Sequence, residues 1–222
     1  LNLSDGIETV SKDITIRIIK PGAPVITSDS VFTVAENQTN IGTVTASDPQ
    51  GDSFTFTISG DEITISSSGE LNFVTAPDYE TKTSYSATVT VTDDEDNFST
   101  QNVTINITNV NDNSPSFTSN EIYSVEENQT AIGSVTATDA DGDGITFTIS
   151  GSEIEVTSEG VLTFTNAPDY EDKTTYTAII TASDGANTST QEITVNITNV
   201  NDESPEFTSN ATFSSEENQT AI

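Results

Sequence analysis

The sequence contains no cysteine, histidine, methionine or tryptophan, and only 5 of its 222 residues are lysine or arginine. Without cysteine, no disulfide bond stabilises the fold. Without histidine or cysteine, the chain lacks the usual partners of a nucleophilic active site. The few cations argue against a nucleic-acid partner and against binding to an anionic membrane surface, because both need clustered lysine or arginine.

The sequence also has no apolar run long enough to cross a membrane, no signal peptide and no initiator methionine. We expect a segment from the interior of a longer protein, without direct insertion into a membrane. Acidic residues are abundant instead, and 36 Asp and Glu give a formal net charge of −31. A compact chain with this charge repels itself unless salt or bound cations screen it.

The chain repeats itself with a period of about ninety residues, which suits a self-contained domain. The motif VAENQT at residues 34–39 recurs as VEENQT at 125–130 and as SEENQT at 215–220. The motif APDYE at residues 76–80 recurs at 167–171. The chain therefore contains two full repeats and parts of two others.

These matches predict the domain boundaries. We assign residues 23–113 and 114–203 to two complete repeats. Residues 1–22 are expected to hold the last strands of a preceding repeat and its linker, and residues 204–222 the opening strands of a following repeat.

Within each full repeat, apolar residues alternate with polar ones, which is typical of strands with one buried face. Glycine and serine turn signals separate these stretches. We predict an all-β fold, with tandem Greek-key β-sandwiches of about seven strands each. The clearest strands are expected at residues 54–58, 85–92 and 103–108, and again at 145–149, 176–180 and 193–197.

A linker rich in Asn and Asp joins the repeats. It reads NVNDNSPSF at residues 109–117 and NVNDESPEF at 199–207. No apolar residue lies between Val110 and Pro115, so this segment cannot lie in a core, and the proline disfavours a helix. Its side-chain and backbone oxygens are the ligands that Ca²⁺ takes, six to eight at a time. We therefore predict that calcium sets the shape of this joint.

Further carboxylates are expected on both sides of the linker. Alternate residues of an extended segment project to the same side, so Asp78 and Glu80 can hold one ion together. Three carboxylates from the first repeat, one from the linker and three from the second make seven, which roughly three Ca²⁺ would nearly balance. These seven are Glu36, Asp78, Glu80, Asp112, Asp139, Asp141 and Asp184.

In motif order, both full repeats and both fragments resemble the cadherin family. Cadherins carry an acidic-Asn motif, an Asp-Arg-Glu motif, an Asp-x-Asn-Asp-Asn linker and an Asp-x-Asp motif, which bind calcium between consecutive domains. Here the second motif reads Asp78-Tyr79-Glu80, and the linker opens with Asn109 instead of Asp. These changes, and the absence of Cys and Trp, are more similar to cadherin-like repeats of bacterial surface proteins than to animal cadherins.

The resemblance implies a set of calcium ligands at each joint. For the joint between the full repeats they are Glu36, Asp78, Glu80, Asn111, Asp112, Asn113, Asp139, Asp141, Asp143, Asp184 and the carbonyl of Val110. For the next joint they are Glu127, Asp169, Glu171, Asn201 and Asp202, with Glu203 in place of Asn113. We expect this second site to be only half-built, because the loop that would complete it follows residue 222.

The joint before the first full repeat differs. Residues 18–25 replace the Asn-Asp linker, and Gln50 stands where Asp141 stands in the second repeat. Both changes remove negative oxygens, so we predict little or no calcium and freer bending at this joint.

Two catalytic or metal-binding alternatives fail on spacing. An EF-hand loop that starts at Asp139 needs a Glu at its twelfth position, where Ser150 stands, and flanking helices. Asp78 and Glu80 are too close together on one strand to flank a sugar substrate as a glycosidase pair does. We therefore predict no enzymatic activity.

The sequence as a whole predicts an extracellular or cell-surface stalk or adhesive segment, rigidified by calcium ions shared between neighbouring repeats. A partner for adhesion, whether a second copy, a surface protein or a polysaccharide, is left open. The competing hypothesis is a module of a larger secreted protein, whose sandwich face or loop tips bind a carbohydrate or a protein.

Overall fold

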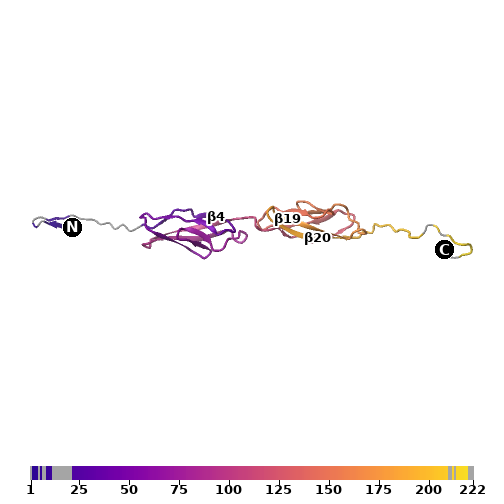
Figure 1. Cartoon of the computed structure of the whole chain (residues 1–222), viewed down its shortest axis with the longest axis horizontal. Helices are drawn as coiled ribbons and strands as arrows, with labels where there is room; N and C mark the ends of the chain where they lie inside the picture. Colours follow the sequence, from indigo (N-terminus) through magenta and orange to yellow (C-terminus); the bar gives the residue numbers. More distant parts are fainter. Residues whose placement is uncertain are drawn as a thin grey trace. The chain divides into compact units, whose positions relative to one another are not determined.

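The computed structural model describes residues 2–4, 6, 9–11, 22–209, 212 and 214–219. It divides into two units, Leu1–Val110 and Asn111–Ile222, each with one full β-sandwich (Figure 1). In the described residues the regular secondary structure is all-β, as predicted. The division falls after Val110, whereas the boundary predicted from the sequence follows Asn113; the assignment of the repeats stays a prediction.

In the first unit, the alternating stretches form strands. Residues 54–58 are a strand as predicted. The strand predicted at 85–92 extends further in both directions, and the strand predicted at 103–108 extends further toward the N-terminus. The elements are β3 (Val25–Ile26), β4 (Val31–Ala35), β5 (Asn40–Thr43), β6 (Ala46–Ser47), β7 (Phe54–Ile58), β8 (Ile63–Ile65), β9 (Glu70–Phe73), β10 (Ser84–Asp93) and β11 (Phe98–Thr108).

These strands form two layers. One sheet has the order β4-β11-β10-β7, in which β4 pairs with β11 in parallel and the other neighbours are antiparallel. The other layer contains the sheet β5-β9-β8 and the short pair β3-β6. The chain changes sheet between β7 and β8 and again between β9 and β10, so the paired strands β8-β9 and β10-β11 lie in opposite layers of the sandwich.

The second unit has the same topology. Its sheets are β13-β20-β19-β16, β14-β18-β17 and the pair β12-β15, again with one parallel pairing, between β13 and β20. The elements are β12 (Ser116–Phe117), β13 (Ile122–Glu126), β14 (Ala131–Ser134), β15 (Ala137–Thr138), β16 (Thr146–Ile149), β17 (Ile154–Val156), β18 (Val161–Phe164), β19 (Thr175–Ser183) and β20 (Thr188–Thr198).

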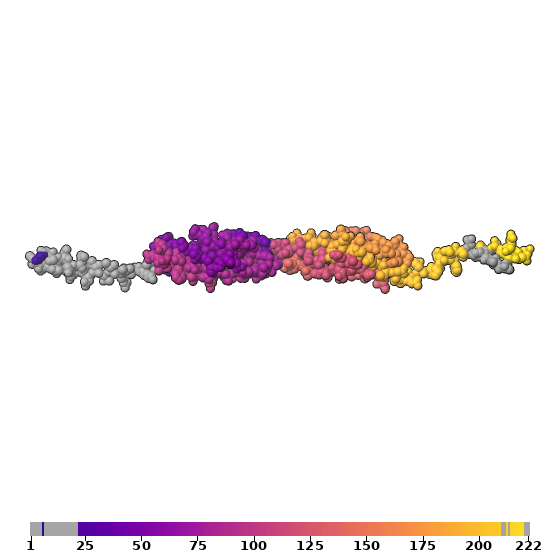
Figure 2. Space-filling model, turned by 90° about the horizontal axis from the view of Figure 1, so that it is seen from below, coloured from indigo at the N-terminus to yellow at the C-terminus, as the bar shows by residue number. Residues whose placement is uncertain are grey.

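Each sandwich has its own core, and each forms a packed body in the space-filling view (Figure 2). Along β11, Val103, Ile105 and Ile107 are buried, while the residues between them are exposed or half-buried. Leu71 from β9 is fully buried in the same cluster, as Leu162 from β18 is in the second unit. Burial of one such side chain stabilises a fold by about 1.5–3 kcal/mol, so these rows fix which face of each strand points inward.

The two ends of the chain are described in part. Near the N-terminus, β1 (Asn2–Ser4) and β2 (Thr9–Ser11) pair as an antiparallel hairpin. Of the predicted calcium-free linker at residues 18–25, positions 18–21 lie outside the described residues. Among the described residues after 203 none is in a strand, and the predicted opening of a further repeat stays a prediction.

Candidate metal centre

A buried glutamate lies at the end of the first repeat from which the chain continues into the linker, which we call the exit end. Glu36 follows β4, and its side chain is 2% exposed. Its Oε2 accepts a hydrogen bond from the backbone N–H of Tyr79 at 2.7 Å, and its Oε1 accepts one from that of Val110 at 2.8 Å. Both oxygens of this buried carboxylate are therefore satisfied, and Glu36 ties the loop at residues 78–80 to the start of the linker. The Val110 carbonyl stays a predicted ligand.

The other two predicted ligands of this repeat lie in that loop. Asp78 accepts hydrogen bonds from the Thr81 hydroxyl at 2.8 Å and from the Glu80 N–H at 3.1 Å. The hydrogen bond from Thr81 is the main reason that the pKa of Asp78 lies below its ordinary value, although burial opposes it. Glu36 and Glu80 each place a carboxylate oxygen within 4.8 Å of the other. The exit end thus presents a cluster of anionic oxygens.

The second repeat builds the same exit end. Glu127 is 2% exposed and accepts hydrogen bonds from the N–H groups of Tyr170 at 2.8 Å and Val200 at 2.7 Å. Glu127, Asp169 and Glu171 bring carboxylate oxygens within 4.8 Å of one another. Burial raises the pKa of Glu171, and the charge of Glu127 raises it further. Three carboxylates held this close favour a bound cation.

The linker after the second repeat adds to this cluster. Glu171, Asp202 and Glu203 also place oxygens within 4.8 Å of one another. Two amides orient them, because Asn199 Nδ2 donates to Glu171 at 2.8 Å and Asn128 Nδ2 donates to Asp202 at 2.6 Å. Glu203 was noted from the sequence only as the replacement for Asn113, and the two asparagines were not predicted as site residues; the repeated VEENQT and NVND motifs, which contain them, were the available signal. The predicted ligand Asn201 is exposed.

A tight turn brings three aspartates together at the end of the second repeat where the chain arrives from the linker, which we call the entry end. Asp139 Oδ1 accepts hydrogen bonds from the N–H groups of Asp141 at 3.0 Å and Asp143 at 3.5 Å. The three residues bring carboxylate oxygens within 4.8 Å of one another. The second oxygen of Asp139, Oδ2, is buried and has no donor among the described residues.

Asp184 is in a similar position at the end of β19. Its Oδ1 accepts hydrogen bonds from the N–H groups of Ala186 at 2.7 Å and Asn187 at 2.6 Å. Burial raises the pKa of Asp184, but these hydrogen bonds outweigh it and the pKa is lowered. Its Oδ2 is buried without a donor from the part of the chain that the structure describes. The entry end therefore contains two buried carboxylate oxygens, Asp139 Oδ2 and Asp184 Oδ2, that have no donor among the described residues.

The linker residues rest on this entry end. Asp141 Oδ2 accepts hydrogen bonds from the backbone N–H groups of Asp112 at 3.1 Å and Asn113 at 2.9 Å. Asn187 Nδ2 donates to Asn111 Oδ1 at 2.8 Å and to the Asn113 carbonyl at 3.1 Å. Asn187 was not predicted as a site residue. A lone asparagine in a hairpin carries no signal in sequence, and only its contacts assign it to the site.

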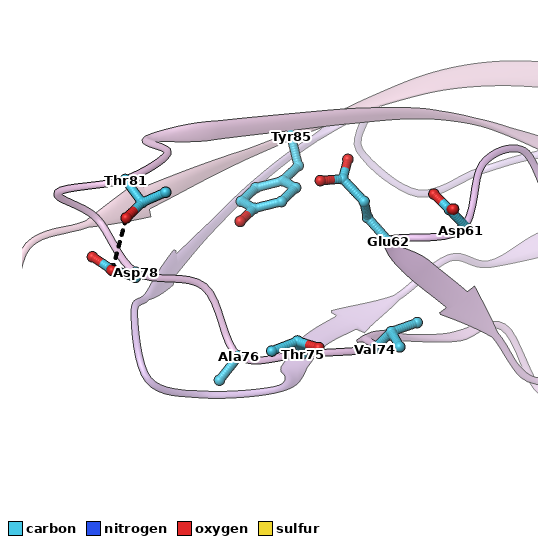
Figure 3. A pocket seen from close by; sticks show the side chains of 8 residues that line it. All are labelled: Asp61, Glu62, Val74, Thr75, Ala76, Asp78, Thr81 and Tyr85. Atoms are coloured by element: carbon cyan, nitrogen blue, oxygen red, sulfur yellow. Dashed lines mark hydrogen bonds between the residues drawn. The ribbon is translucent and has the colours of Figure 1, made fainter.

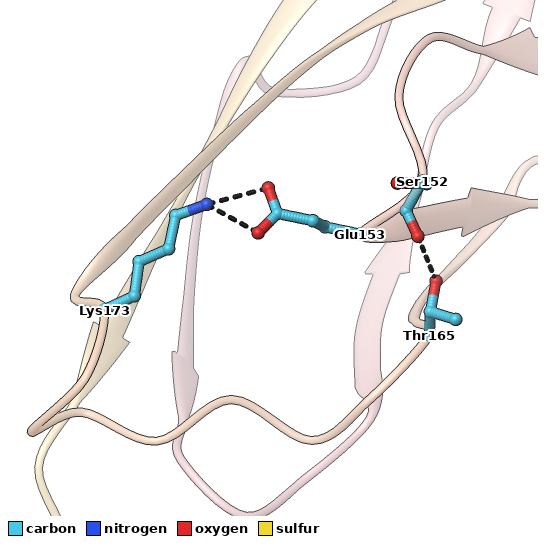
Figure 4. Close-up of polar contacts among 4 residues, drawn as sticks. All are labelled: Ser152, Glu153, Thr165 and Lys173. Atoms are coloured by element: carbon cyan, nitrogen blue, oxygen red, sulfur yellow. Dashed lines mark hydrogen bonds and ion pairs between the residues drawn. The ribbon is translucent and has the colours of Figure 1, made fainter.

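The lysine of each repeat is bonded to a glutamate outside these clusters. Lys173 donates to both carboxylate oxygens of Glu153 at 2.7 Å (Figure 4). Its Nζ also lies 4.2 Å from the centre of the Tyr176 ring. Lys82 makes the same contacts with Glu62 and Tyr85. Among the residues that the structure describes, Lys82 and Lys173 are the only lysines or arginines, and both are paired with glutamates outside the carboxylate clusters. They are therefore not placed to neutralise those clusters.

A shallow hollow in the first repeat lies beside Tyr85, between the loop at residues 74–78 and the start of β8 (Figure 3). Lys82 covers a face of the Tyr85 ring at 4.0 Å from its centre, and Phe73 packs against the ring at 4.8 Å between centres. These two contacts occupy part of the Tyr85 ring and leave less of it open for a sugar to stack on.

The first repeat has a different arrangement at the strand end that corresponds to Asp184. There, Asp93 is 5% exposed and accepts hydrogen bonds from the N–H groups of Glu95 at 2.9 Å and Asn97 at 2.8 Å. The Asn97 side chain donates to its other oxygen at 3.0 Å. Burial raises the pKa of Asp93, but the hydrogen bonds from Asn97 and Glu95 outweigh it and lower the pKa below 3.8.

This arrangement predicts an acid dependence of the first repeat. Because the pKa of Asp93 is lower in the folded state, the residue stabilises the repeat above about pH 4, and the contribution is lost as the pH falls through the folded-state pKa. We expect Asp93→Asn to be less stable at about pH 7 and to lose less stability between about pH 7 and 3 than the unmodified chain. Thermal unfolding in chelator at several pH values measures this. The exposed neighbour Asp94 is the control, since Asp94→Asn should keep the acid dependence; equal losses in all three proteins would contradict the prediction.

Comparison with known proteins gives the class. A family model described as the bacterial Ig domain matches residues 21–106 and 111–198. The chain is similar to Cadherin-99C of Drosophila melanogaster, with 32% identity over 193 residues, which are 78% of this chain and 11% of that protein. It is similar to human Protocadherin Fat 4, with 31% identity over 164 residues, 65% of this chain and 3% of that protein. The chain thus spans only a small part of the length of these relatives.

Solved structures agree on the fold. Human Protocadherin-24 EC1-2 superposes with a TM-score of 0.70 at 18% identity, covering 82% of this chain and 100% of that one. Mouse Cadherin-23 EC22-24 gives a TM-score of 0.71 at 22% identity, covering 81% of this chain and 68% of that one. The two units are therefore a tandem of cadherin-like β-sandwich repeats, as the motif order indicated.

The match to the family model extends over most of the chain, and the chain belongs to the bacterial Ig domain family. Its repeats are of the extracellular or cell-surface adhesion type, a type that is generally non-enzymatic. Within the described ranges there is no helix with the length and apolar character that a membrane span requires.

Proposed function

We propose that the carboxylates at the ends of the repeats bind calcium, and that ions shared between consecutive repeats stiffen the joints of an extracellular stalk or adhesive segment. The observation that supports this most directly is the pair of buried oxygens at the entry end of the second repeat. Asp139 Oδ2 and Asp184 Oδ2 have no donor in the described residues. A buried carboxylate oxygen without a partner is costly, and a cation is a partner that would relieve that cost.

The donor set suits calcium. The clusters offer oxygen ligands only, which exclude soft thiolate and imidazole sites and match the six to eight oxygens that Ca²⁺ takes. Bound calcium would supply positive charge where the chain concentrates negative charge. The residues that would hold it are Glu36, Asp78 and Glu80; the Val110 carbonyl, Asn111, Asp112 and Asn113; Asp139, Asp141, Asp143 and Asp184; and Glu127, Asp169, Glu171, Asn201 and Asp202, to which we add Glu203.

Calcium titration tests the ligand assignment. Asp184→Asn keeps the size of the side chain and the oxygen that accepts from Ala186 and Asn187, but it removes the charge. We expect its calcium affinity at the entry end to fall by about tenfold or more, since carboxylate charge sets the affinity of such sites. Isothermal titration calorimetry on the whole chain measures the number of ions and their affinities.

The control for this titration is Asp94→Asn, which removes the same charge from an exposed position in the first repeat. It should leave every affinity within about twofold, because exposed charges at a distance are screened. If Asp184→Asn bound calcium as tightly as this control, the buried oxygen would not be a ligand and the proposal would fail at its main support.

Stiffening of the joint is a separate measurement. We expect small-angle X-ray scattering of the chain in millimolar calcium to give a narrow distribution of conformations, and excess chelator to broaden it. Calcium at about 100 times its dissociation constant should also stabilise the repeats by about 2.7 kcal/mol. Scattering that is identical in both conditions would mean that calcium does not set the joint.

We also propose partners other than calcium. Neighbouring repeats of the chain are the primary partners, because the exit cluster of one repeat and the entry cluster of the next would share ions. Adhesion to a second copy, a surface protein or a polysaccharide would be carried by the longer protein. The competing hypothesis of a carbohydrate-binding module is less well supported, since Lys82 and Phe73 already contact the Tyr85 ring that lines the hollow of the first repeat.

A further inference from the structure

The segment that enters the first repeat is bound to the sandwich by neutral groups. The backbone N–H of Gly22 donates to the side-chain oxygen of Gln50 at 3.0 Å. Ser99, in β11, donates to the carbonyl of Pro24. A Cβ on Gly22 would lie 3.3 Å from both polar atoms of the Gln50 amide, so the backbone rests directly against this side chain. We call the Gly22–Gln50 contact the linker seat of the first repeat.

The second repeat has the same seat with a charged residue. When the motifs are aligned, Asn113 corresponds to Gly22 and Asp141 to Gln50. The N–H of Asn113 donates to Asp141 Oδ2 at 2.9 Å, so the same backbone group meets a carboxylate instead of an amide.

The turns that carry these two residues are also alike. Asp48 Oδ1 accepts from the N–H groups of Gln50 at 2.8 Å and of Asp52 at 3.2 Å. Asp139 Oδ1 accepts from the N–H groups of Asp141 and Asp143 in the same way. The backbone of the seat is thus shared by the two repeats, and charge is what distinguishes them.

The aspartate at the end of the strand beside each seat also has different hydrogen-bond partners in the two repeats. In the first repeat, the Asn97 side chain donates to Asp93, and both oxygens of Asp93 have donors. In the second repeat, the Asn187 side chain donates to the linker, and Asp184 Oδ2 has no donor among the described residues. The first repeat keeps one buried oxygen of this kind, Asp48 Oδ2, against two in the second. One such oxygen is far from the six to eight that Ca²⁺ takes.

We propose that Gln50 is the residue that makes the linker seat of the first repeat independent of calcium, whereas the corresponding seat on Asp141 depends on it. The neutral amide accepts the backbone hydrogen bond without adding a negative charge next to Asp48, Asp52 and Asp93. No cation is then needed to hold the entering segment on the sandwich. The second half of this inference rests on the proposed calcium function; the first half does not.

Amide hydrogen exchange, followed by NMR on the whole chain, tests both halves. The readouts are the backbone N–H groups of Gly22 and Asn113, each measured in millimolar calcium and in excess chelator. We expect the Gly22 exchange rate to be slow and equal in the two conditions. We expect the Asn113 rate to rise in chelator by about tenfold or more, as removal of a bound ion loosens its seat.

Substitutions locate the effect. Gln50→Ala should speed exchange at Gly22 by about tenfold in both conditions, because one hydrogen bond is lost. Gln38→Ala removes an exposed amide elsewhere in the first repeat and should leave Gly22 unchanged. Gln50→Asp should make exchange at Gly22 faster in chelator than in calcium, since it restores the charge found at Asp141.

The outcomes separate the two proposals. If Gly22 exchanges rapidly in the unmodified chain, or becomes faster in chelator, the role of Gln50 is wrong whatever Asn113 does. If Gly22 behaves as expected and Asn113 is indifferent to chelator, Gln50 still forms a metal-independent seat, but the contrast with Asp141 and the proposed calcium function are both overturned.

Discussion

Replacing Gly160 by alanine is expected to destabilise the second repeat by about 4 kcal/mol or more. Gly160 has φ +92, and a Cβ there would lie 2.3 Å from the backbone oxygen of Val135. The position itself costs an L-residue about 1–2 kcal/mol. The overlap costs more, because its partner is backbone: the Val135 N–H donates to the Gly160 carbonyl at 2.9 Å and cannot move away without losing that bond.

Thermal unfolding that resolves the two repeats measures this effect. For a repeat of this size, the melting temperature should fall by roughly 15–30 °C, while the first repeat keeps its own transition. Gly151→Ala is the matched control, since Gly151 has φ +90 and nothing within 4 Å of the added Cβ. That variant should lose only about 1–2 kcal/mol. Equal losses in both variants would show that the contact with Val135 is not tight.

Replacing Glu127 by alanine is expected to destabilise the second repeat by about 3 kcal/mol even without calcium. The change leaves the N–H groups of Tyr170 and Val200 without their acceptor, and both bonds involve a charged, buried oxygen. Removal of the charge also relieves repulsion with Asp169 and Glu171. That gain is smaller, because both of these residues are exposed and solvent screens them.

The measurement is denaturant unfolding in excess chelator, so that any lost ion binding does not contribute. Glu127→Gln should have an intermediate effect, because the amide keeps one accepting oxygen and the volume of the side chain. Glu126→Ala is the control, since the adjacent glutamate is exposed and should contribute less than about 0.5 kcal/mol. If Glu127→Ala were as stable as Glu126→Ala in chelator, the glutamate would act only through calcium.

Much of the fold follows from the sequence alone. The strict alternation at Val103, Ile105 and Ile107 indicated a strand with one buried face, and the structure buries these residues. The reason is local: side chains alternate along any strand, so the pattern itself states which face meets the core. The motif order likewise indicated cadherin-like repeats, and the comparisons confirm that class. The calcium ligands predicted from the acidic motifs stay a prediction, although the structure does bring several of these carboxylates together.

The tertiary structure alone decided what each carboxylate does. Glu36 and Asp184 are both acidic residues next to strand ends, yet Glu36 has both oxygens satisfied by backbone and Asp184 has one oxygen with no donor in the described residues. The partners of Glu36 lie 43 and 74 residues away in the chain. Such separations are brought together by the pairing and packing of the two sheets, which no local spacing reveals.

The two asparagines of the hairpins show the same limit. Asn97 turns inward to its own aspartate, and Asn187 turns outward to the linker. The residue type by itself determined that each would make hydrogen bonds through an amide. The hairpin that carries it is one residue longer in the first repeat, and the bonds that the amide makes differ between the two hairpins. The sequence by itself determines the charge and the strand pattern, whereas the orientation of each polar group depends on the packing of strands that are distant in the chain.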